Sequence, residues 1–306
     1  MLDLNRLKAL HAVHIYGSVG AAADALMVTP SAVSQQIAKL ERETGARLVE
    51  RNGRGVRLTD AAGLLAEHAE RILALVETAE ADFEALRGEV VGRLNMAAFP
   101  TAIRGLMPLT LTALRQRHPD LLINLYEREP ERIVRDVARG ELDMGVIQDW
   151  MNRPMALPEG LSRSTLLDDI ADVILPAGHP LADRKEIELA ELCGERWISS
   201  SPATVCHDWL VFTLRSADLE PEISCMADEY PTQMTLVAAG LGCAIIPRLG
   251  RELVPPGVAV VPIRPRQTRR IYVIWRTDAA RRPAIRAAVE ALAEASRTQE
   301  NAWAVN

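Results

Sequence analysis

The sequence predicts an α/β protein that carries an all-α domain at its amino-terminal end. Three observations predict this organisation. The first 60 residues have mostly helical periodicity, an uninterrupted helical pattern continues to about residue 88, and from Val91 onward short apolar strands alternate with helices. A chain of 306 residues is long enough for two or three domains, each with a sizeable core.

The composition is that of an ordinary globular protein, with 48% apolar and 25% charged residues. A net charge of −6 argues against a protein covered with basic surface for nucleic acid or anionic lipid. The charge is uneven, however, because residues 1–60 contain eight Lys or Arg and only six Asp or Glu. The small basic excess therefore lies in the helical domain.

The sequence gives no sign of secretion or of a membrane span. The first residues lack the apolar core of a signal peptide, and the longest apolar run, residues 234–246, is too short to cross a bilayer. The four cysteines form no CxxC pair; they are Cys193, Cys206, Cys225 and Cys243. We therefore expect a cytoplasmic protein with reduced thiols and no membrane partner.

The helix that begins at Pro30 has one apolar and one polar face. Thr29 is a good N-cap, and a proline at the first helical position costs nothing, because its missing N–H would be unpaired there anyway. The buried stripe is predicted at Val33, Ile37 and Leu40. The opposite side is small and polar, with Ser31, Ser34 and Gln35.

The surrounding elements give this polar face a function. A helix ended by Gly17 and a short helix over Val19–Leu26 precede it, and a hairpin with an Asn-Gly turn follows it over Leu48–Thr59. This order is a winged helix-turn-helix, in which the third helix enters the DNA major groove. Ser34 and Gln35 would bond to base edges. The wing arginines would hold phosphates; they are Arg51, Arg54 and Arg57.

A solvated Ser/Gln surface is the alternative interpretation of this helix. For an isolated helix that alternative would be preferred. The short second helix and the basic hairpin are both correctly placed for DNA binding, so the winged helix-turn-helix is the stronger prediction.

Residues 59–88 form one helical pattern. Its apolar positions recur at alternating spacings of four and three, which is the pattern of a coiled-coil seam. They are Leu65, Ala69, Ile72, Val76, Ala79, Phe83 and Leu86. The alternative is a helix packed on its own domain, but the sequence indicates no neighbouring core. A dimerising linker helix is therefore predicted.

From Val91 onward the chain repeats a strand–helix pattern twice. Such alternation predicts βαβ units and a parallel sheet. Segments near residues 162–170 and 262–269 would cross between two similar lobes. A cleft is expected between these lobes.

These segments resemble the LysR-type transcriptional regulators over essentially the whole chain. The residues that carry the resemblance are "GSVGAAADALMVTPSAVSQQIAKLERETGARLVERNGRGVRLTDAAG", "ELDMGVI", "PAGHPLA" and "LVAAGLGCAIIP". The resemblance implies a winged helix-turn-helix over 1–60, a linker helix over 61–89 and an effector domain over 90–300 that is similar to periplasmic binding proteins. Lobe I would comprise about 90–162 and 268–297, and lobe II about 163–267.

The resemblance also implies partners and DNA-facing residues. The partners would be double-stranded promoter DNA, a small effector between the lobes and further copies of the chain, as a homodimer or homotetramer. The base-facing positions would be Pro30, Ser31, Ser34 and Gln35, with Arg54 in the wing. Many members have Gln where Pro30 stands and Arg where Gln35 stands. Gln prefers adenine whereas Arg prefers guanine, so the half-site should differ.

The effector cleft of the family is formed by strand ends and helix amino-termini, where backbone N–H groups attract anions. The matching positions here are Pro100, Thr101, Gln148, Ser200 and Thr204, with Glu127 and Asp228 after their own strands. Each Ser or Thr taken alone is more often just a helix cap. The acids would suit an amine, so a carboxylate and an amino acid both remain candidate effectors.

Two other classes of function compete with an effector-controlled regulator. An enzyme or a solute-binding protein could use the α/β lobes, but the histidines show no HExxH spacing and the chain has no GxSxG elbow or phosphate loop. We therefore predict no catalytic residue, metal or cofactor. A thiol redox sensor is the other alternative, because one branch of the family senses peroxide with second-lobe cysteines. Cys206 lies in that region.

Overall fold

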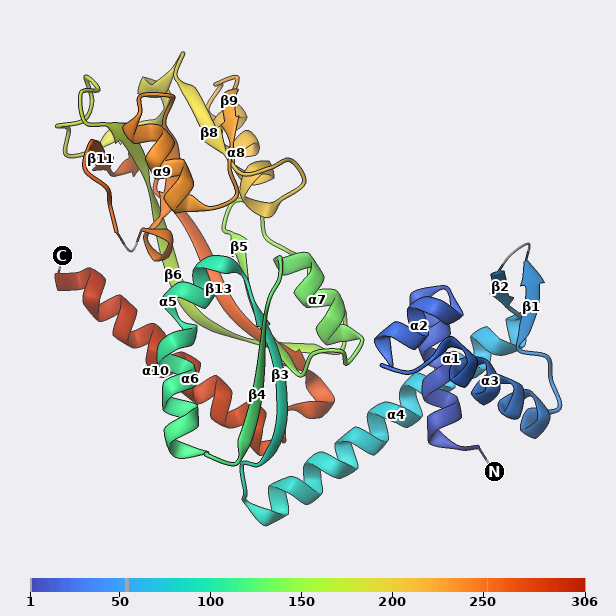
Figure 1. The fold of residues 1–306 in the computed structure, drawn as a ribbon. Helices are drawn as coiled ribbons and strands as arrows, with labels where there is room; N and C mark the ends of the chain where they lie inside the picture. The colour runs from blue at the N-terminus through green and yellow to red at the C-terminus, as the bar shows by residue number, and fades with distance from the viewer. Residues whose placement is uncertain (1, 53–54, 252, 306) are drawn as a thin grey trace. The chain divides into compact units, whose positions relative to one another are not determined.

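The computed structural model describes residues 2–52, 55–251 and 253–305 (Figure 1). The chain divides into two compact units, Met1–Arg87 and Gly88–Asn306, and each has its own hydrophobic core. Within the described residues, no helix is both long and apolar enough to cross a bilayer. The same residues contain no cluster of three side chains suited to holding a metal ion.

The first unit contains the predicted winged helix-turn-helix. Three helices are followed by a two-stranded antiparallel hairpin in which Val49 lies opposite Leu58. The elements are α1 (Leu4–Tyr16), α2 (Val19–Ala25), α3 (Pro30–Thr44), β1 (Val49–Asn52) and β2 (Gly55–Leu58).

Helix α3 begins and ends where its sequence dictates. The Thr29 Oγ1 accepts the Ala32 N–H at 3.3 Å, and Pro30 occupies the first helical position. The helix ends at Gly45, whose φ of 68° is readily adopted only by glycine. The predicted apolar stripe is buried in the core of this unit; it consists of Val33, Ile37 and Leu40.

Helix α4 (Asp60–Arg87) packs against its own unit along its first half. Ala62, Ala66 and Ala69 are fully buried against the core that contains α1, because alanines let two helices approach closely. The sequence prediction that this helix has no neighbouring core is therefore wrong for the first half. Leu65 and Ile72, two residues of the predicted seam, are partly buried against the same core.

Three large apolar residues of α4 remain exposed. Leu64, Leu75 and Phe83 are 60%, 70% and 68% exposed. Leu64 and Leu75 share one side of the helix, whereas Phe83 lies further along the side that carries Leu65 and Ile72. The Leu86 side chain lies outside the description. The dimerising role of α4 remains a prediction.

The second unit is built on a seven-stranded sheet. The strand order is β10-β6-β13-β5-β3-β4, and β11 also pairs with β6. The strands are β3 (Gly92–Ala98), β4 (Leu121–Glu127), β5 (Met144–Trp150), β6 (Leu161–Pro176), β10 (Ala244–Pro247), β11 (Val258–Val261) and β13 (Gln267–Arg276). Strand β3 is parallel to β4 and β5, whereas β13 is antiparallel to β5 and β6. The sheet is mixed, so the prediction of a parallel sheet was only partly correct.

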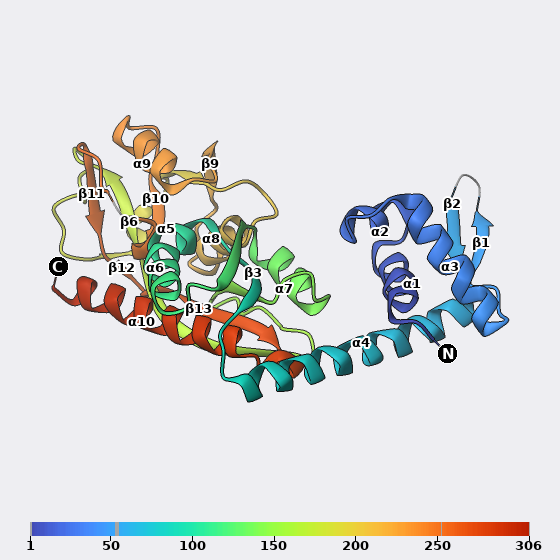
Figure 2. The same ribbon diagram turned by 60° about the horizontal axis from the view of Figure 1, so that its bottom comes forward.

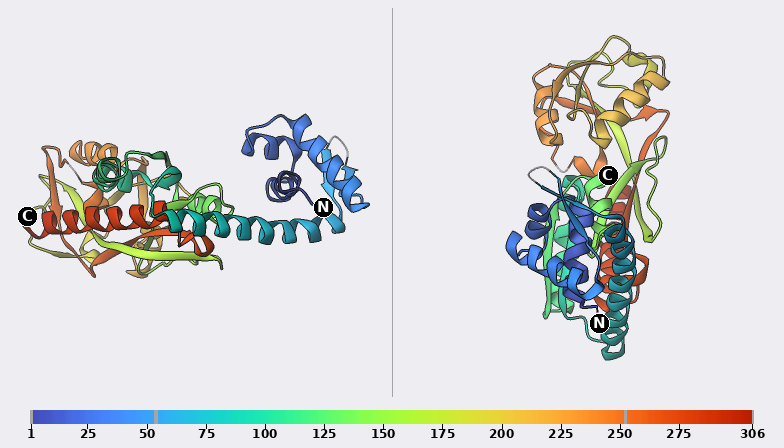
Figure 3. Two further views of the ribbon diagram at one scale, coloured as in Figure 1. Left: turned by 90° about the horizontal axis from the view of Figure 1, so that it is seen from below. Right: turned by 90° about the vertical axis from the view of Figure 1, so that its right-hand side faces the viewer.

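The long strands β6 and β13 connect two lobes, as Figure 1 shows. The first lobe contains α5 (Pro100–Gly105), α6 (Met107–Arg117), α7 (Pro130–Ala138), η3 (Thr277–Ala279) and α10 (Pro283–Val305). The second lobe contains β7 (Ile187–Glu188), η1 (Leu189–Leu192), β8 (Arg196–Ser199), α8 (Val205–Ser216), β9 (Glu222–Met226), α9 (Tyr230–Ala238), η2 (Arg248–Gly250) and β12 (Ile263–Arg264). Helix α10 packs against α6 and β6 (Figures 2 and 3).

The two lobes have separate cores that meet along β6 and β13. Met96, Val146 and Leu292 belong to the main core of the first lobe. In the second lobe the rings of Trp150 and Trp209 stack with centroids 3.5 Å apart. Trp150 ends β5, so this stack fixes a first-lobe strand to α8 of the second lobe.

Candidate DNA-binding surface and ligand cleft

The outer face of α3 is polar and exposed. Val33, Ile37 and Leu40 point into the core, so the residues between them point to solvent. The four residues predicted to face DNA bases are all exposed: Pro30, Ser31, Ser34 and Gln35.

Some of these side chains already hydrogen-bond within the protein, and others do not. The Ser31 Oγ lies 2.9 Å from the Thr29 Oγ1, and the Ser34 hydroxyl donates to the Pro30 carbonyl at 3.0 Å. The Gln35 side chain makes no hydrogen bond to any other described residue. Its amide therefore has both donors and its acceptor available, which is the arrangement that can bond an adenine edge in two places.

The wing is joined to α3 by Glu41. Its Oε1 accepts the N–H groups of Leu48 and Val49 at 2.8 and 3.2 Å. This carboxylate fixes the start of β1 relative to the helix, so the wing and the recognition helix form one surface.

The predicted wing arginines are only partly described. Arg51 lies on β1, but its side chain is outside the description, and Arg54 lies outside the described residues altogether. Arg57 is exposed on β2, with its Nη2 3.6 Å from Glu50 Oε2. This loose ion pair leaves the Arg57 guanidinium able to reach phosphate.

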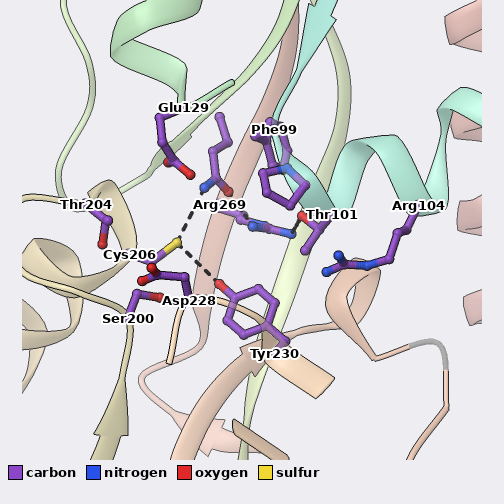
Figure 4. A pocket seen from close by; sticks show the side chains of 12 residues that line it. Phe99, Thr101, Arg104, Glu129, Ser200, Thr204, Cys206, Asp228, Tyr230 and Arg269 are labelled. Atoms are coloured by element: carbon purple, nitrogen blue, oxygen red, sulfur yellow. Dashed lines mark hydrogen bonds between the residues drawn. The ribbon is translucent and has the colours of Figure 1, made fainter. Parts of the chain in front are cut away.

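A cleft in the second unit is lined by side chains from both lobes, and its cavity has a volume of about 40 Å³ (Figure 4). That volume holds only a few water-sized molecules. Six of the seven predicted effector residues line it: Pro100, Thr101, Gln148, Ser200, Thr204 and Asp228. The seventh, Glu127, is exposed at the end of β4 and is not in the lining, whereas Glu129 is.

The cleft lies where helices begin. Thr101 is in the first turn of α5, and Thr204 is the N-cap of α8, where its Oγ1 accepts the His207 N–H at 3.2 Å. Asp228 lies between β9 and α9 and accepts the Ser201 N–H at 2.7 Å. Thr204 and Asp228 therefore already hold the local backbone, which places the loops around the cavity.

Arg269 is the most connected side chain of the cleft. It is 1% exposed, and its Nε and Nη2 lie 2.9 and 2.8 Å from the Asp169 Oδ2. Nη2 also donates to the Thr101 Oγ1 at 2.9 Å, and Nη1 donates to the Gln148 Oε1. Burial lowers the pKa of Arg269 and the facing Asp169 carboxylate raises it, with a net upward shift. Burial raises the pKa of Asp169, and Arg269 opposes this shift. The charge of the buried carboxylate therefore depends on its guanidinium partner.

Cys206 lies in the first turn of α8 and lines the same cavity. Its Sγ accepts weak hydrogen bonds from the Tyr230 hydroxyl at 3.3 Å and the Gln148 Nε2 at 3.5 Å (Figure 4). Burial raises the pKa of the Cys206 thiol, although the nearby Arg269 opposes this shift. The protonated thiol is therefore the favoured form.

The rim of the cleft is acidic. Burial, and then the carboxylates of Glu131 and Asp228, raise the pKa of Glu129. Glu129 makes no ion pair with a described residue, whereas Arg104 is paired with Glu229 at 2.7 Å. The cleft thus offers two carboxylates without a cationic partner among the described residues, Glu129 and Asp228, beside arginines that are already paired.

The lining also contains residues that sequence patterns do not assign to a ligand cleft. They are Phe99, Arg104, Glu129, Cys206, Tyr230 and Arg269. One signal for Arg269 exists in the sequence: "DD" at 168–169 and "RR" at 269–270 lie in the two predicted crossing segments. Their register pairs Arg269 with Asp169 and Arg270 with Asp168.

A winged helix-turn-helix together with a two-lobed domain that carries a polar cleft defines a ligand-responsive DNA-binding regulator. The chain belongs to the LysR family of transcriptional regulators. Residues 4–63 match the bacterial regulatory helix-turn-helix protein model of the lysR family, and residues 87–297 match the LysR substrate binding domain. Members of this family bind DNA and small effectors, oligomerise, and are regulators and not enzymes.

Named relatives agree with this assignment. The chain is 31% identical to the transcriptional regulator TtuA of Agrobacterium vitis over 86% of each chain. It is 30% identical to the uncharacterised regulator YnfL of Escherichia coli K12, over 93% of this chain and 96% of YnfL. Among solved structures, a peroxide-bound cysteine mutant of Corynebacterium glutamicum OxyR is similar, with 25% identity, a TM-score of 0.61 and coverage of 97% of this chain and 93% of that chain.

Proposed function

We propose that α3 reads promoter DNA through Ser34 and Gln35, with Pro30 and Ser31 against the base edges. The observation that carries this proposal is the exposed polar face of α3, on which the Gln35 amide has no partner among the described residues. Arg51 and Arg54 in the wing would hold phosphates, which orients the helix without reading sequence.

Substitutions on α3 and in the wing separate these two roles. Ser34→Ala with Gln35→Ala should weaken specific binding, because base contacts contribute about 1–3 kcal/mol each, and should leave non-specific binding unchanged. Arg54→Ala should weaken binding to all sequences. It should also reduce the slope of log affinity against log salt concentration by about one unit, as expected for the loss of one phosphate contact. Gln36→Ala, one position further along α3, is the control. Equal losses of specific and non-specific affinity in the α3 variant would exclude base reading.

We propose, secondly, that a small polar effector binds between the lobes and shifts the regulator between two states on DNA. Six predicted residues from both lobes surround the cavity, which supports this site. A ligand larger than a few waters must open the cavity, so it would bind the open and closed lobes with different affinity. Glu129 would meet an amine of the ligand, and Arg104 would meet its carboxylate. An amino acid carries both groups.

A thermal-shift screen of small acids and amino acids tests this proposal, since a ligand of the native state raises the apparent stability. Thr101→Val should abolish the shift of amino-acid hits, which are expected in the cleft, because it removes the hydroxyl to which Arg269 donates. Thr110→Val is the matched control: Thr110 is also fully buried, but it bonds only to the Leu106 carbonyl in α6. If every amino-acid hit shifts both variants equally, the cleft is not the effector site.

A second candidate is peroxide sensing by Cys206. The small cavity, the thiol in its wall and the similarity to a peroxide-bound OxyR mutant favour it. A hydroperoxide would convert the thiol to a sulfenic acid and release water or an alcohol. The raised thiol pKa opposes this reaction. Trapping of a sulfenic acid at Cys206 after peroxide treatment, and its loss in Cys206→Ser, would establish it; an unchanged free-thiol content would exclude it.

A further inference from the structure

A second and larger cavity lies in the same unit as the cleft. Its volume is about 320 Å³, which is within the range of small-molecule sites. It shares no lining residue with the cleft. Val260 on β11 and Pro262 form part of its wall in the second lobe, and Trp303 near the end of α10 forms another part.

Trp303 brings a helix of the first lobe to a cavity that second-lobe residues also line. The first half of α10 belongs to the first-lobe core through Ile285 and Leu292. The same helix continues well beyond these residues (Figures 2 and 3). Trp303, near its end, lines the cavity together with second-lobe residues. The apolar and aromatic part of the cavity is therefore contributed from both lobes.

The polar part of the cavity contains two arginines and one carboxylate. The Asp172 Oδ2 lies 2.8 Å from the Arg251 Nη2 and 3.7 Å from the Arg248 Nε. The side chains of Asp172 and Arg251 are only 6% and 11% exposed. One carboxylate cannot neutralise two guanidinium groups, so the described lining carries an excess positive charge.

The donors of these arginines are not all used. The Arg251 Nε is buried and has no hydrogen-bond acceptor among the described residues. The 3.7 Å contact of Arg248 is longer than a hydrogen bond. A buried donor without an acceptor costs free energy, and an anionic acceptor forms the strongest kind of bond with it.

We propose that this cavity is a second ligand site, which takes a small carboxylate with an apolar or aromatic body. The carboxylate would be held by Arg248 and Arg251, and the body would lie against Val260 and Trp303. The site is independent of the effector cleft, because the two share no residue.

Benzoate is a suitable probe, and its binding to the full chain can be measured by isothermal titration calorimetry. Benzyl alcohol and benzylamine have the same ring without the negative charge. We expect benzoate to bind wild type at one site and the other two compounds not to bind. Thr101→Val, which alters only the cleft, should leave benzoate affinity unchanged. Arg248→Gln should weaken it about tenfold or more, because a charge-assisted bond is lost.

Two further variants keep the test decisive. Arg196→Gln removes an exposed arginine of the same lobe on β8, and should bind benzoate as wild type does. Trp303→Ala leaves the charged cluster intact and should also weaken benzoate binding; it decides the outcome if Arg248→Gln does not fold. The proposal is overturned if benzoate does not bind, if neither Arg248→Gln nor Trp303→Ala reduces its affinity, or if Thr101→Val abolishes binding.

Discussion

At the scale of single residues, two neighbouring ion pairs between β6 and β13 have very different surroundings. Arg269 and Asp169 face each other inside the protein, while Arg270 and Asp168, one position along the same two strands, face each other at the surface. The alternation of side chains along paired strands produces this difference. A buried pair is costly to break because the remaining charge has no solvent.

Arg269→Met should therefore destabilise the protein by about 3–5 kcal/mol, because Asp169 is left as an unpaired buried charge. Adding Asp169→Asn should recover part of that loss. The Asn side chain is neutral and can still accept the Leu249 N–H that Asp169 accepts at 3.2 Å. Urea unfolding of the two variants measures both effects.

The exposed pair supplies the control for this prediction. Arg270→Met removes an arginine from the same strand and should change the free energy of unfolding little. An Arg269→Met variant as stable as Arg270→Met would show that the buried pair does not hold the two strands together.

Glu129 makes the stability of the second unit depend on pH. The folded protein raises the pKa of this carboxyl, chiefly by burial. The folded state therefore binds this proton more tightly than the unfolded chain, and the stability gained from it is lost as pH rises past the ordinary carboxyl range. Glu129→Gln should match wild type at about pH 4 and have the higher melting temperature at about pH 7.

Melting curves at the two pH values check this expectation. Glu290→Gln, an exposed change on α10, should behave as wild type at both. A Glu129→Gln variant that is no more stable than wild type at neutral pH would contradict a cost of burying the ionised Glu129 carboxylate.

Residues of the cleft were predictable where their role is local. Thr101 and Thr204 follow strands and begin helices, and this pattern is legible within a few residues of sequence. Arg269 could not be found in this way, since its partner Asp169 lies 100 positions away and only the pairing of β6 with β13 brings them together. An ion pair between strands that are distant in sequence leaves no local sequence pattern.

At the scale of elements, α3 was fully predictable and α4 was not. Helix α3 has one apolar stripe and clear caps, so its buried and exposed faces follow from the sequence. Helix α4 has apolar residues on more than one side, and periodicity cannot state which side meets which partner. The fully buried alanines Ala62, Ala66 and Ala69 show that one side belongs to its own unit.

The exposed apolar side chains of α4 are the ones that we expect a partner chain to cover. Leu75→Asp with Phe83→Asp should dissociate a dimer without unfolding the unit, because both residues are solvent-exposed within one chain and a charge becomes costly only when a partner covers it. The molar mass from sedimentation equilibrium measures the change. Leu253→Asp is the control, since Leu253 is 86% exposed on the other unit. An unchanged mass for the double variant would remove α4 as the dimer contact.

At the scale of the whole molecule, alternating strands and helices predicted two α/β lobes joined by crossing segments. They did not predict that β6 and β13 are long enough to make one continuous mixed sheet of both lobes. Strand direction depends on how the chain returns through space, which local periodicity does not record. The continuous sheet means that any change of angle between the lobes must bend β6 and β13.

The central claim is that this LysR-family chain recognises DNA sequence through the polar face of α3. Selection of bound sequences from a random duplex library tests it most directly. Wild type should enrich two related half-sites whose centres are separated by about one or more helical turns, as a dimeric helix-turn-helix requires. The Ser34→Ala, Gln35→Ala variant should retain binding to bulk DNA and lose that enrichment. Enrichment of the same half-sites by the variant, or of none by wild type, would contradict the claim.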